Sequence, residues 1–381
     1  MDEADWPRLT LAEVDRVLRR YPETGGAAEL LSYSPRPFSA ASIVATTHGR
    51  VFVKRHHRSV RDRAGLLEEH RFIEHLRRAD WGSSEPLVPA VVAARDGETV
   101  TLDGEWTYEV HELARGVDVY EQALSWTPFL CAEHAKAAGQ ALAKLHRAAQ
   151  GYDAPARAEG QLVSSYSIFA SDDPIKAMER YLASRLSLRS YAEKRSWQQS
   201  MDAFLLPLHS QLRPWTGYLK PLWTHNDFHA SNLTWSGAGE DAAVRAIVDF
   251  GLADRTNAIH DLATAIERNV IEWLRMDEPA ADLVHYDHLD AMLTGYTSLL
   301  PLSYEEARAL VTMLPLVHCE FALSETEYFL SILHSEEKAY LAYEGYFLAH
   351  AEWFLSEQGG QLLAHLQRWA DAQPKRSMGE R

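Results

Sequence analysis

Four side chains in the middle of the chain are of the types that phosphoryl transfer requires. His225, Asp227 and Asn232 follow the spacing H-x-D-x-x-x-x-N, and Asp249 opens the string Asp-Phe-Gly 22 residues after the first acid. One carboxylate can orient an attacking hydroxyl, while a second carboxylate and an amide oxygen can hold Mg²⁺ on nucleotide phosphates. A β-hairpin is predicted between the two acids, so we expect Asp227, Asn232 and Asp249 to surround one cleft.

A lysine and a glutamate earlier in the chain complete this set. Lys54 lies near the end of the returning strand of a predicted hairpin, where its charge could neutralise phosphates. Glu69 falls within the apolar arc of a helix predicted over residues 63–78, and a carboxylate is costly there unless it is paired. Helix phase therefore favours Glu69 over its neighbour Glu68 as the residue that holds Lys54 in place.

The order of these motifs resembles that of the aminoglycoside phosphotransferase and choline kinase group, which shares the protein-kinase-like fold. The resemblance covers roughly residues 28–275. Besides the motifs above, it rests on Leu145 and His146 at the end of a long helix, and on the string Asp261, Leu262, Ala263. It implies an ATP- and Mg²⁺-dependent phosphotransferase that acts on a hydroxyl of a small molecule.

The same resemblance implies a role for each candidate residue. Asp227 is expected to be the catalytic base, and Asn232 and Asp249 are expected to bind the metal. Lys54 is expected to contact the α- and β-phosphates of ATP, with Glu69 behind it.

The expected adenine contacts lie in a hinge between two lobes. By the same resemblance this hinge spans Glu112 to Gly116, with the carbonyl of Glu112 and the amide of Ala114 facing adenine. The sequence departs from the family at two places. Asn226 stands where the family often has glycine, and the predicted phosphate-covering loop, near residues 34–42, contains no glycine. Kinase activity is compatible with both departures, but the sequence does not predict which atoms of that loop would contact the phosphates.

The predicted elements indicate an α+β, two-lobed, protein-kinase-like fold. Residues 1–115 are expected to form a nucleotide-binding lobe, with a leading helix, an antiparallel sheet and one inserted helix. Strands are predicted in it at residues 30–34, 42–46, 51–54, 91–94, 99–102 and 107–113. Residues 116–373 are expected to form a mostly helical catalytic and acceptor-binding lobe, and residues 374–381 a frayed tail.

Composition narrows the class of protein. Of the 381 residues, 46% are hydrophobic and 24% are charged, as in globular proteins. Cys131 and Cys319 are too few for a disulfide scaffold and suit reduced thiols in the cytoplasm. No basic and apolar leader and no run of about 18 apolar residues is visible, so we expect no membrane association. The net charge of −16 argues against nucleic-acid binding.

The excess negative charge lies entirely after residue 100, where 39 acidic residues accompany 23 basic ones. One interpretation is surface solubility, and the other is an acidic site for a cationic acceptor. The candidate acids for such a site are Glu267, Glu272, Glu320 and Glu325.

Other interpretations of the motifs stay open. A Ser/Thr protein kinase would need a longer activation loop than residues 252–260 provide, and a non-catalytic nucleotide-binding regulator usually lacks the base or a metal ligand. His225 and His229 could bind zinc only on a helix with a third ligand nearby. The basic run at residues 54–58, with Arg61 and Arg63, is interpreted as a solvated turn. The acceptor, the choice between ATP and GTP, and the oligomeric state stay open.

Overall fold

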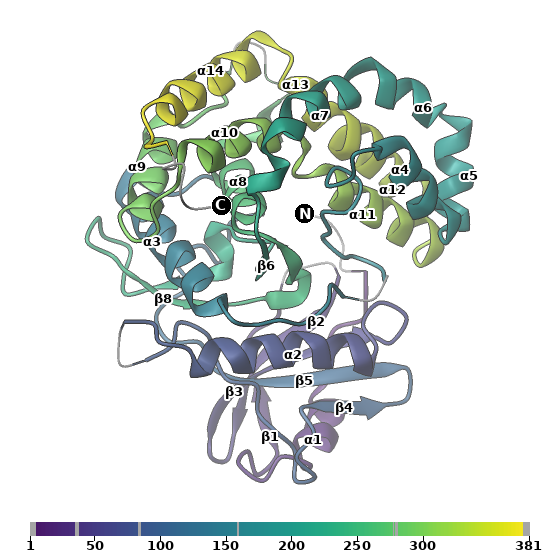
Figure 1. The fold of residues 1–381 in the computed structure, drawn as a ribbon. Coiled ribbons are helices and arrows are strands. Elements are labelled where there is room, and N and C mark those ends of the chain that lie inside the picture. Colours follow the sequence, from purple (N-terminus) through teal and green to yellow (C-terminus); the bar gives the residue numbers. More distant parts are fainter. Residues whose placement is uncertain are drawn as a thin grey trace.

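The computed structural model describes residues 5–34, 38–82, 85–157, 160–276, 278 and 281–375. An antiparallel sheet lies at one end of the molecule, and helices with two short strand pairs form the remainder (Figure 1). The predicted α+β fold class is therefore confirmed. Most of the predicted frayed tail and residues 35–37 of the predicted phosphate-covering loop lie outside the described residues.

Five strands form the sheet in the order β1-β2-β3-β5-β4. Their bounds are β1 Ala27–Leu30, β2 Ala40–Thr46, β3 Gly49–His57, β4 Val100–Asp103 and β5 Trp106–Glu112. The β2–β3 hairpin confirms the sequence prediction, and β3 brings Lys54 directly opposite Glu109 of β5. Because directly paired residues project from the same face of a sheet, these two side chains lie on one side.

Each face of the sheet is covered by a helix. Helix α1 (Leu11–Leu18) packs its apolar side on the face that contains Val53. Helix α2 (Arg63–Arg78) has the bounds predicted from the sequence, and it covers the face that carries Lys54. Glu69 is only 3% exposed, as helix phase predicted, whereas Glu68 is half-buried.

The first predicted strand, at residues 30–34, forms earlier in the chain as β1. Two further sequence predictions in this part of the chain are wrong. Arg55, His56 and Arg61 are buried rather than part of a solvated turn, because carboxylates and main-chain carbonyls of other elements accept their hydrogen bonds. The strand predicted at residues 91–94 is reduced to an isolated bridge between Val91 and His111. Strand β4 already occupies most of that edge of β5, so only the last residues of β5 are free to pair.

The chain leaves the sheet at Gly116, which requires glycine for two reasons. Its φ is +91°, and a Cβ atom there would lie 2.6 Å from the carbonyl oxygen of Trp235. The close approach is fixed by the next residue, Val117, which exchanges two main-chain hydrogen bonds with Trp235 at 2.8 and 2.9 Å. A larger residue would separate these two segments.

The rest of the chain is mostly helical (Figure 1). Its longer helices are α3 Ala132–Ala149, α4 Pro174–Ala183, α5 Leu186–Lys194, α7 Leu206–Leu212, α8 Ala258–Val270, α9 Tyr286–Thr297, α10 Tyr304–Met313, α11 Cys319–Ser331 and α14 Glu357–Asp371. Short helices are α6 Trp197–Ser200, α12 Glu336–Tyr340 and α13 His350–Trp353, and π-helical turns cover Met201–Leu205 and Leu341–Ala349. Four short strands lie among them: β6 Pro221–Thr224, β7 Leu233–Trp235, β8 Val244–Ile247 and β9 Asp254–Asn257.

One helical segment, Tyr304–Ser331, is long and apolar enough to cross a membrane by length and composition alone. Within the protein, 94% of its most apolar window is buried. The segment contains α10 and α11, whose apolar side chains belong to the large hydrophobic core of the helical part. Its apolar character is therefore accounted for by packing inside the fold.

Candidate active site

Two loops that join short strands carry the predicted catalytic residues. Strand β6 pairs with β9, and β7 pairs with β8, as the predicted hairpin requires. The first loop, residues 225–232, joins β6 to β7, and the second, residues 248–253, joins β8 to β9. The loops touch where Nε2 of His225 donates a hydrogen bond to the carbonyl oxygen of Val248 at 3.0 Å.

Asp227 lies in the first loop among groups that stabilise its negative charge. Nδ2 of Asn232 donates to the Asp227 carbonyl at 2.9 Å and to its carboxylate at 3.3 Å. Nε2 of His229 and Nη2 of Arg268 lie 3.6 and 3.5 Å from the two carboxylate oxygens. Burial alone would raise the pKa of Asp227, but attraction to His229 and Arg268 outweighs it and holds the pKa well below its usual range. The carboxylate is therefore ionised at neutral pH and can accept a hydrogen bond from a hydroxyl group.

Asp249 in the second loop joins the helical part to the sheet through Lys54. Nζ of Lys54 lies 2.8 Å from Oδ1 of Asp249. Burial would raise the pKa of Asp249, but the charge of Lys54 lowers it. Burial would likewise lower the pKa of Lys54, but Asp249, Glu109 and Glu69 raise it. Both groups are therefore charged, and the Asp249 side chain stays 33% exposed, so it is accessible to a ligand.

Asp261, in the first turn of α8, anchors the first loop. Its carboxylate is fully buried and accepts hydrogen bonds from the main-chain amides of His225 and Asn226 at 3.0 and 2.7 Å. Nε2 of His146, at the end of α3, donates to the same carboxylate at 3.0 Å. Asp261 and His146 therefore have structural roles, because their contacts hold the two residues that precede Asp227.

The conformation of Asn226 explains why the sequence can depart from glycine at this position. Its φ is +60°, in the left-handed region that favours glycine and tolerates asparagine. Its side-chain oxygen accepts hydrogen bonds from the hydroxyls of Thr224 and Thr256 at 2.9 and 3.0 Å, and its Nδ2 donates to the Leu252 carbonyl at 3.1 Å. The asparagine therefore joins the two loops in a way that glycine could not.

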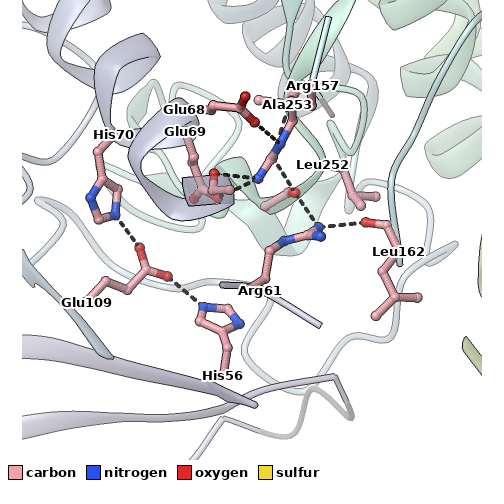
Figure 2. A network of polar contacts seen from close by, with 12 residues as sticks. His56, Arg61, Glu68, Glu69, His70, Glu109, Arg157, Leu162, Leu252 and Ala253 are labelled. Carbon is pink, nitrogen blue, oxygen red and sulfur yellow. Dashed lines mark hydrogen bonds and ion pairs between the residues drawn. The ribbon is translucent and has the colours of Figure 1, made fainter. Parts of the chain in front are cut away.

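Glu69 is close to the site, but its ion-pair partner is an arginine that the sequence analysis did not single out. Nη2 of Arg157 lies 3.8 Å from Oε2 of Glu69 (Figure 2). Lys54 pairs with Asp249 instead. Glu69 acts on Lys54 through its charge, which raises the pKa of the lysine. Arg157 also donates to the carbonyls of Gly251 and Gly65 at 3.0 and 2.9 Å, so it ties the second loop to α2.

Arg61 makes a second connection between the sheet part and the helical part (Figure 2). Its guanidinium donates to the main-chain carbonyls of Gln161, Leu162 and Gly251 at 2.7, 2.6 and 2.7 Å. Burial, with a smaller contribution from Arg157, lowers its pKa to about 10, which leaves it charged at neutral pH. No sequence motif marks Arg61 or Arg157, because both bind main-chain oxygens that any residue could supply.

The zinc interpretation of His225 and His229 is excluded by the hydrogen bonds of His225. Its Nε2 donates to Val248, and its Nδ1 accepts the main-chain amide of Asp227 at 3.2 Å. Both ring nitrogens are thus held by main-chain groups, and residues 225–229 lie in a loop and not on the helix that this interpretation requires. His229 and Arg268, by contrast, face Asp227 and were not foreseen, since their positions depend on the packing of α8 against the loop.

The predicted hinge residues border a small cavity of about 220 Å³. Glu112 ends β5, and Ala114 lies two residues later in the link to Gly116. The cavity is lined by Arg77, Glu85, Pro86, Leu87, Val88, Pro89, Glu112, Leu113, Ala114, Arg115 and Ala246. Neither Lys54 nor Asp249 is among these residues, so the cavity lies beside the catalytic cluster and not at it.

The acids considered for a cationic acceptor are mostly engaged by the protein itself. Glu320 accepts hydrogen bonds from main-chain amides and serine hydroxyls of residues 165–169. Glu272 pairs with Nε2 of His285 at 2.7 Å, and Glu267 pairs with Nδ1 of His350 at 3.1 Å. Glu325 is buried. Glu267 is linked to the candidate base through Arg268, which contacts both Glu267 and Asp227.

Solved structures with the same fold include several small-molecule kinases. A microcompartment-associated aminopropanol kinase is 19% identical, with a TM-score of 0.58 over 92% of this chain and 99% of that one. An aminoglycoside phosphotransferase from Alicyclobacillus acidocaldarius is 15% identical, with a TM-score of 0.52 over 95% and 97%. A mutant of aminoglycoside phosphotransferase APH(4)-Ia in complex with ADP and hygromycin B is 13% identical, with a TM-score of 0.50 over 89% and 98%. At these identities the likeness shows the fold.

The chain has no significant sequence match among curated proteins. A family model described as the phosphotransferase enzyme family matches residues 38–302, which is more than half of the chain. This range includes strands β2 to β5 of the sheet, both loops of the candidate site and the anchor at Asp261. The protein therefore belongs to the phosphotransferase enzyme family, as the motifs in its sequence predicted.

Proposed function

We propose that the protein transfers the γ-phosphate of ATP to a hydroxyl group of a small molecule. The observation that carries the proposal is the juxtaposition of Asp227 and Asn232 in one loop with Asp249, which pairs with Lys54 at 2.8 Å. Membership in the phosphotransferase enzyme family supports it. The ADP in the related APH(4)-Ia complex supports the use of an adenine nucleotide.

Each side chain has a role that its surroundings support. The ionised carboxylate of Asp227 would accept a hydrogen bond from the acceptor hydroxyl and orient it toward the phosphate. Lys54 would contact the α- and β-phosphates. The nearby charge of Glu69 raises the pKa of Lys54 and so helps to keep the lysine protonated. Glu112 and Ala114 would contact adenine through main-chain atoms.

Asn232 and Asp249 offer donors that suit Mg²⁺, a hard cation that prefers oxygen ligands. Nδ2 of Asn232 faces Asp227, which leaves its amide oxygen as the available donor, and the Asp249 carboxylate is partly exposed. When bound, the ion would neutralise nucleotide phosphate charge. The Lys54–Asp249 contact holds the metal-binding carboxylate and the phosphate-binding cation next to each other before a nucleotide binds.

The acceptor is proposed to be a small molecule and not a protein. The segment after Asp249 continues directly into β9 and α8, so it supplies no long loop of the kind that protein kinases use. Within small molecules, the net charge of −16 favours a cationic acceptor through long-range attraction. The acids considered for direct contact bind other protein groups or are buried, so the overall charge is the main support for this narrower hypothesis.

The proposal is tested by incubating the purified protein with ATP, Mg²⁺ and a panel of amine-bearing and neutral hydroxyl compounds. Mass spectrometry then detects the addition of a phosphate group. Asp227→Asn should lower kcat by about 10²–10⁴-fold with little effect on ATP binding, because the base faces the acceptor. Asp249→Ala should abolish Mg²⁺-dependent turnover, because the metal loses its charged ligand. Asp290→Asn, a matched change at an exposed acid of α9, should leave turnover unchanged.

Full activity in Asp227→Asn would refute the assigned role of this residue. ATP binding without turnover across the whole panel would favour a nucleotide-binding regulator instead. For the narrower hypothesis, kcat/KM for an amine-bearing acceptor should fall as ionic strength rises. A neutral acceptor used efficiently without a salt effect would contradict a cationic acceptor but leave the phosphotransferase proposal intact.

A further inference from the structure

Three histidines converge on one buried glutamate on the α2 side of the sheet. Glu109 of β5 is 1% exposed. Its Oε2 lies 2.9 Å from Nε2 of His70 and 2.8 Å from Nε2 of His111, while its Oε1 lies 2.9 Å from Nε2 of His56. Figure 2 shows His70 reaching Glu109 from the helix and His56 reaching it from the neighbouring strand.

The convergence follows from the periods of the elements. Side chains two apart on a strand share a face, so Glu109 and His111 project together from β5. On β3, His56 shares the same face because it stands two residues after Lys54, which pairs with Glu109. His70 lies on the buried side of α2. Three elements that are distant in sequence therefore place their imidazoles around one carboxylate.

The cluster around Glu109 contains more imidazole nitrogens than an ion pair with one carboxylate needs. One carboxylate can neutralise only one imidazolium, yet three imidazoles present Nε2 to it. Nε2 of His70, Nε2 of His111 and a Glu109 oxygen all lie within 4.8 Å of one another. Two imidazoles and a carboxylate form a donor set that Zn²⁺ binds, with a fourth position for water. We propose that His70, Glu109 and His111 form a zinc site that links helix α2 to strand β5.

The hydrogen bond at the far side of His70 supports this assignment. Nδ1 of His70 lies 2.8 Å from the hydroxyl oxygen of Thr99. Without a metal, Thr99 donates to Nδ1 while Nε2–H donates to Glu109. With a metal, Nδ1–H donates to the Thr99 oxygen, which frees the lone pair of Nε2 for the ion. A hydroxyl can serve both tautomers, and such an outer partner is typical of histidine ligands.

His56 and His111 complete the surroundings of the site. His56, on the other oxygen of Glu109, orients the carboxylate without being a ligand. The His111 side chain is 16% exposed, which gives water and metal a path to an otherwise buried site. Ligand distances of about 2.0–2.2 Å to Zn²⁺ require each of the two ligand nitrogens to move away from the Glu109 oxygen by only about half an ångström. The site is distinct from the oxygen donors of Asn232 and Asp249 proposed for Mg²⁺.

The test measures Zn²⁺ binding to the metal-stripped, full-length protein by competition with a chromogenic chelator, in buffer with excess Mg²⁺. The wild type should bind one equivalent of Zn²⁺ tightly, and its unfolding temperature should rise with Zn²⁺ concentration. His111→Asn and His70→Asn should each weaken binding by at least about 100-fold, and Thr99→Val by about 10–100-fold. His111 lies next to the last residue of β5 and is partly exposed, so the protein without this ligand should remain folded.

A second group of possible ligands, His285, Asp287 and His288, provides the matched control. His285→Asn removes a ligand there and should leave tight Zn²⁺ binding unchanged. Circular dichroism without metal shows which variants are folded. The proposal is overturned if the folded wild type binds no Zn²⁺, if folded His111→Asn binds as tightly as the wild type, or if only His285→Asn abolishes binding.

Discussion

The substitution Asp261→Asn tests how the fold holds the candidate base in place. The Asp261 carboxylate acts on Asp227 indirectly. It accepts hydrogen bonds from the main-chain amides of His225 and Asn226, the two residues that precede Asp227, at 3.0 and 2.7 Å. It also accepts Nε2 of His146 at 3.0 Å. Asparagine has nearly the same volume, but it carries no charge and has one oxygen instead of two. Its NH₂ group must therefore face at least one of the donors that Asp261 now satisfies.

The expected magnitude follows from these contacts. A hydrogen bond to a charged group contributes about 1.5–3 kcal/mol, and an unsatisfied buried donor adds its own cost. If the asparagine oxygen keeps His225 and His146, its NH₂ group faces the amide of Asn226 and that bond is lost. We expect the free energy of unfolding to fall by about 3 kcal/mol. Because a displacement of about 1 Å can cost about 10²-fold in rate, kcat should fall by about 10–100-fold.

The assay compares kcat, the KM for ATP and the free energy of unfolding of the purified variant at a temperature well below its unfolding transition. The KM for ATP should change little, because Lys54 and Asp249 keep their contact. Asp287→Asn, in the first turn of α9, controls for loss of an acid near a helix start, and it should leave kcat unchanged. A folded Asp261→Asn protein with wild-type kcat would refute the anchoring role.

Two further predictions concern other buried groups. Arg157→Met should lower the free energy of unfolding by about 3–5 kcal/mol, because its loss leaves the Glu69 carboxylate buried without its ion-pair partner. It should also lower kcat more than Glu69→Gln does, because Arg157 holds Gly251 and α2 together. Equal kcat values, measured at a temperature where both variants are folded, would contradict this. Burial lowers the pKa of His260 to about 4. As the pH falls, His260 therefore takes up a proton in the unfolded protein before it does so in the folded protein. The stability that its neutral form contributes above about pH 6.5 should be lost as the pH falls toward 4. We expect the free energy of unfolding to fall by about 2 kcal/mol between about pH 7 and 5. Urea unfolding of His260→Phe should show a pH dependence smaller by that amount, and an unchanged slope would contradict the burial argument.

The sequence predicted the parts of the fold that depend on local periodicity. The bounds of α2 and the burial of Glu69 follow from the apolar spacing of one helix, and the β2–β3 hairpin follows from two short strands around a turn. The strand near residues 91–94 could not be judged in the same way. Its pairing depends on whether another strand already occupies the edge of β5, which is a property of the whole sheet.

The residues of the candidate site also fall into those that the sequence predicts and those that only the folded structure reveals. Asp227, Asn232 and Asp249 are recognisable because phosphoryl transfer requires those side-chain types at fixed spacing. Arg157 and Arg61 are not recognisable, because they bind main-chain carbonyls, and a carbonyl leaves no trace in the sequence. The basic run after Lys54 was misinterpreted for a related reason. Its partners, such as Glu109 for His56, come from strands that are adjacent only in the folded sheet.

The two loops of the candidate site have one backbone feature in common, a non-glycine residue with positive φ. Asn226 and Asp249 both adopt positive φ, at 60° and 62°, and each costs energy that the surroundings must offset. For Asn226, the offset comes from Asp261 and from side-chain bonds to Thr224 and Thr256. For Asp249 it comes from Lys54 and from the amide of Gly251, whose carbonyl is held by two arginines. Asn226 directly precedes Asp227, so both turns fix the backbone from which the two carboxylates project. The polar networks behind the loops are therefore part of the site, because without them the backbone would relax and the carboxylates would turn away.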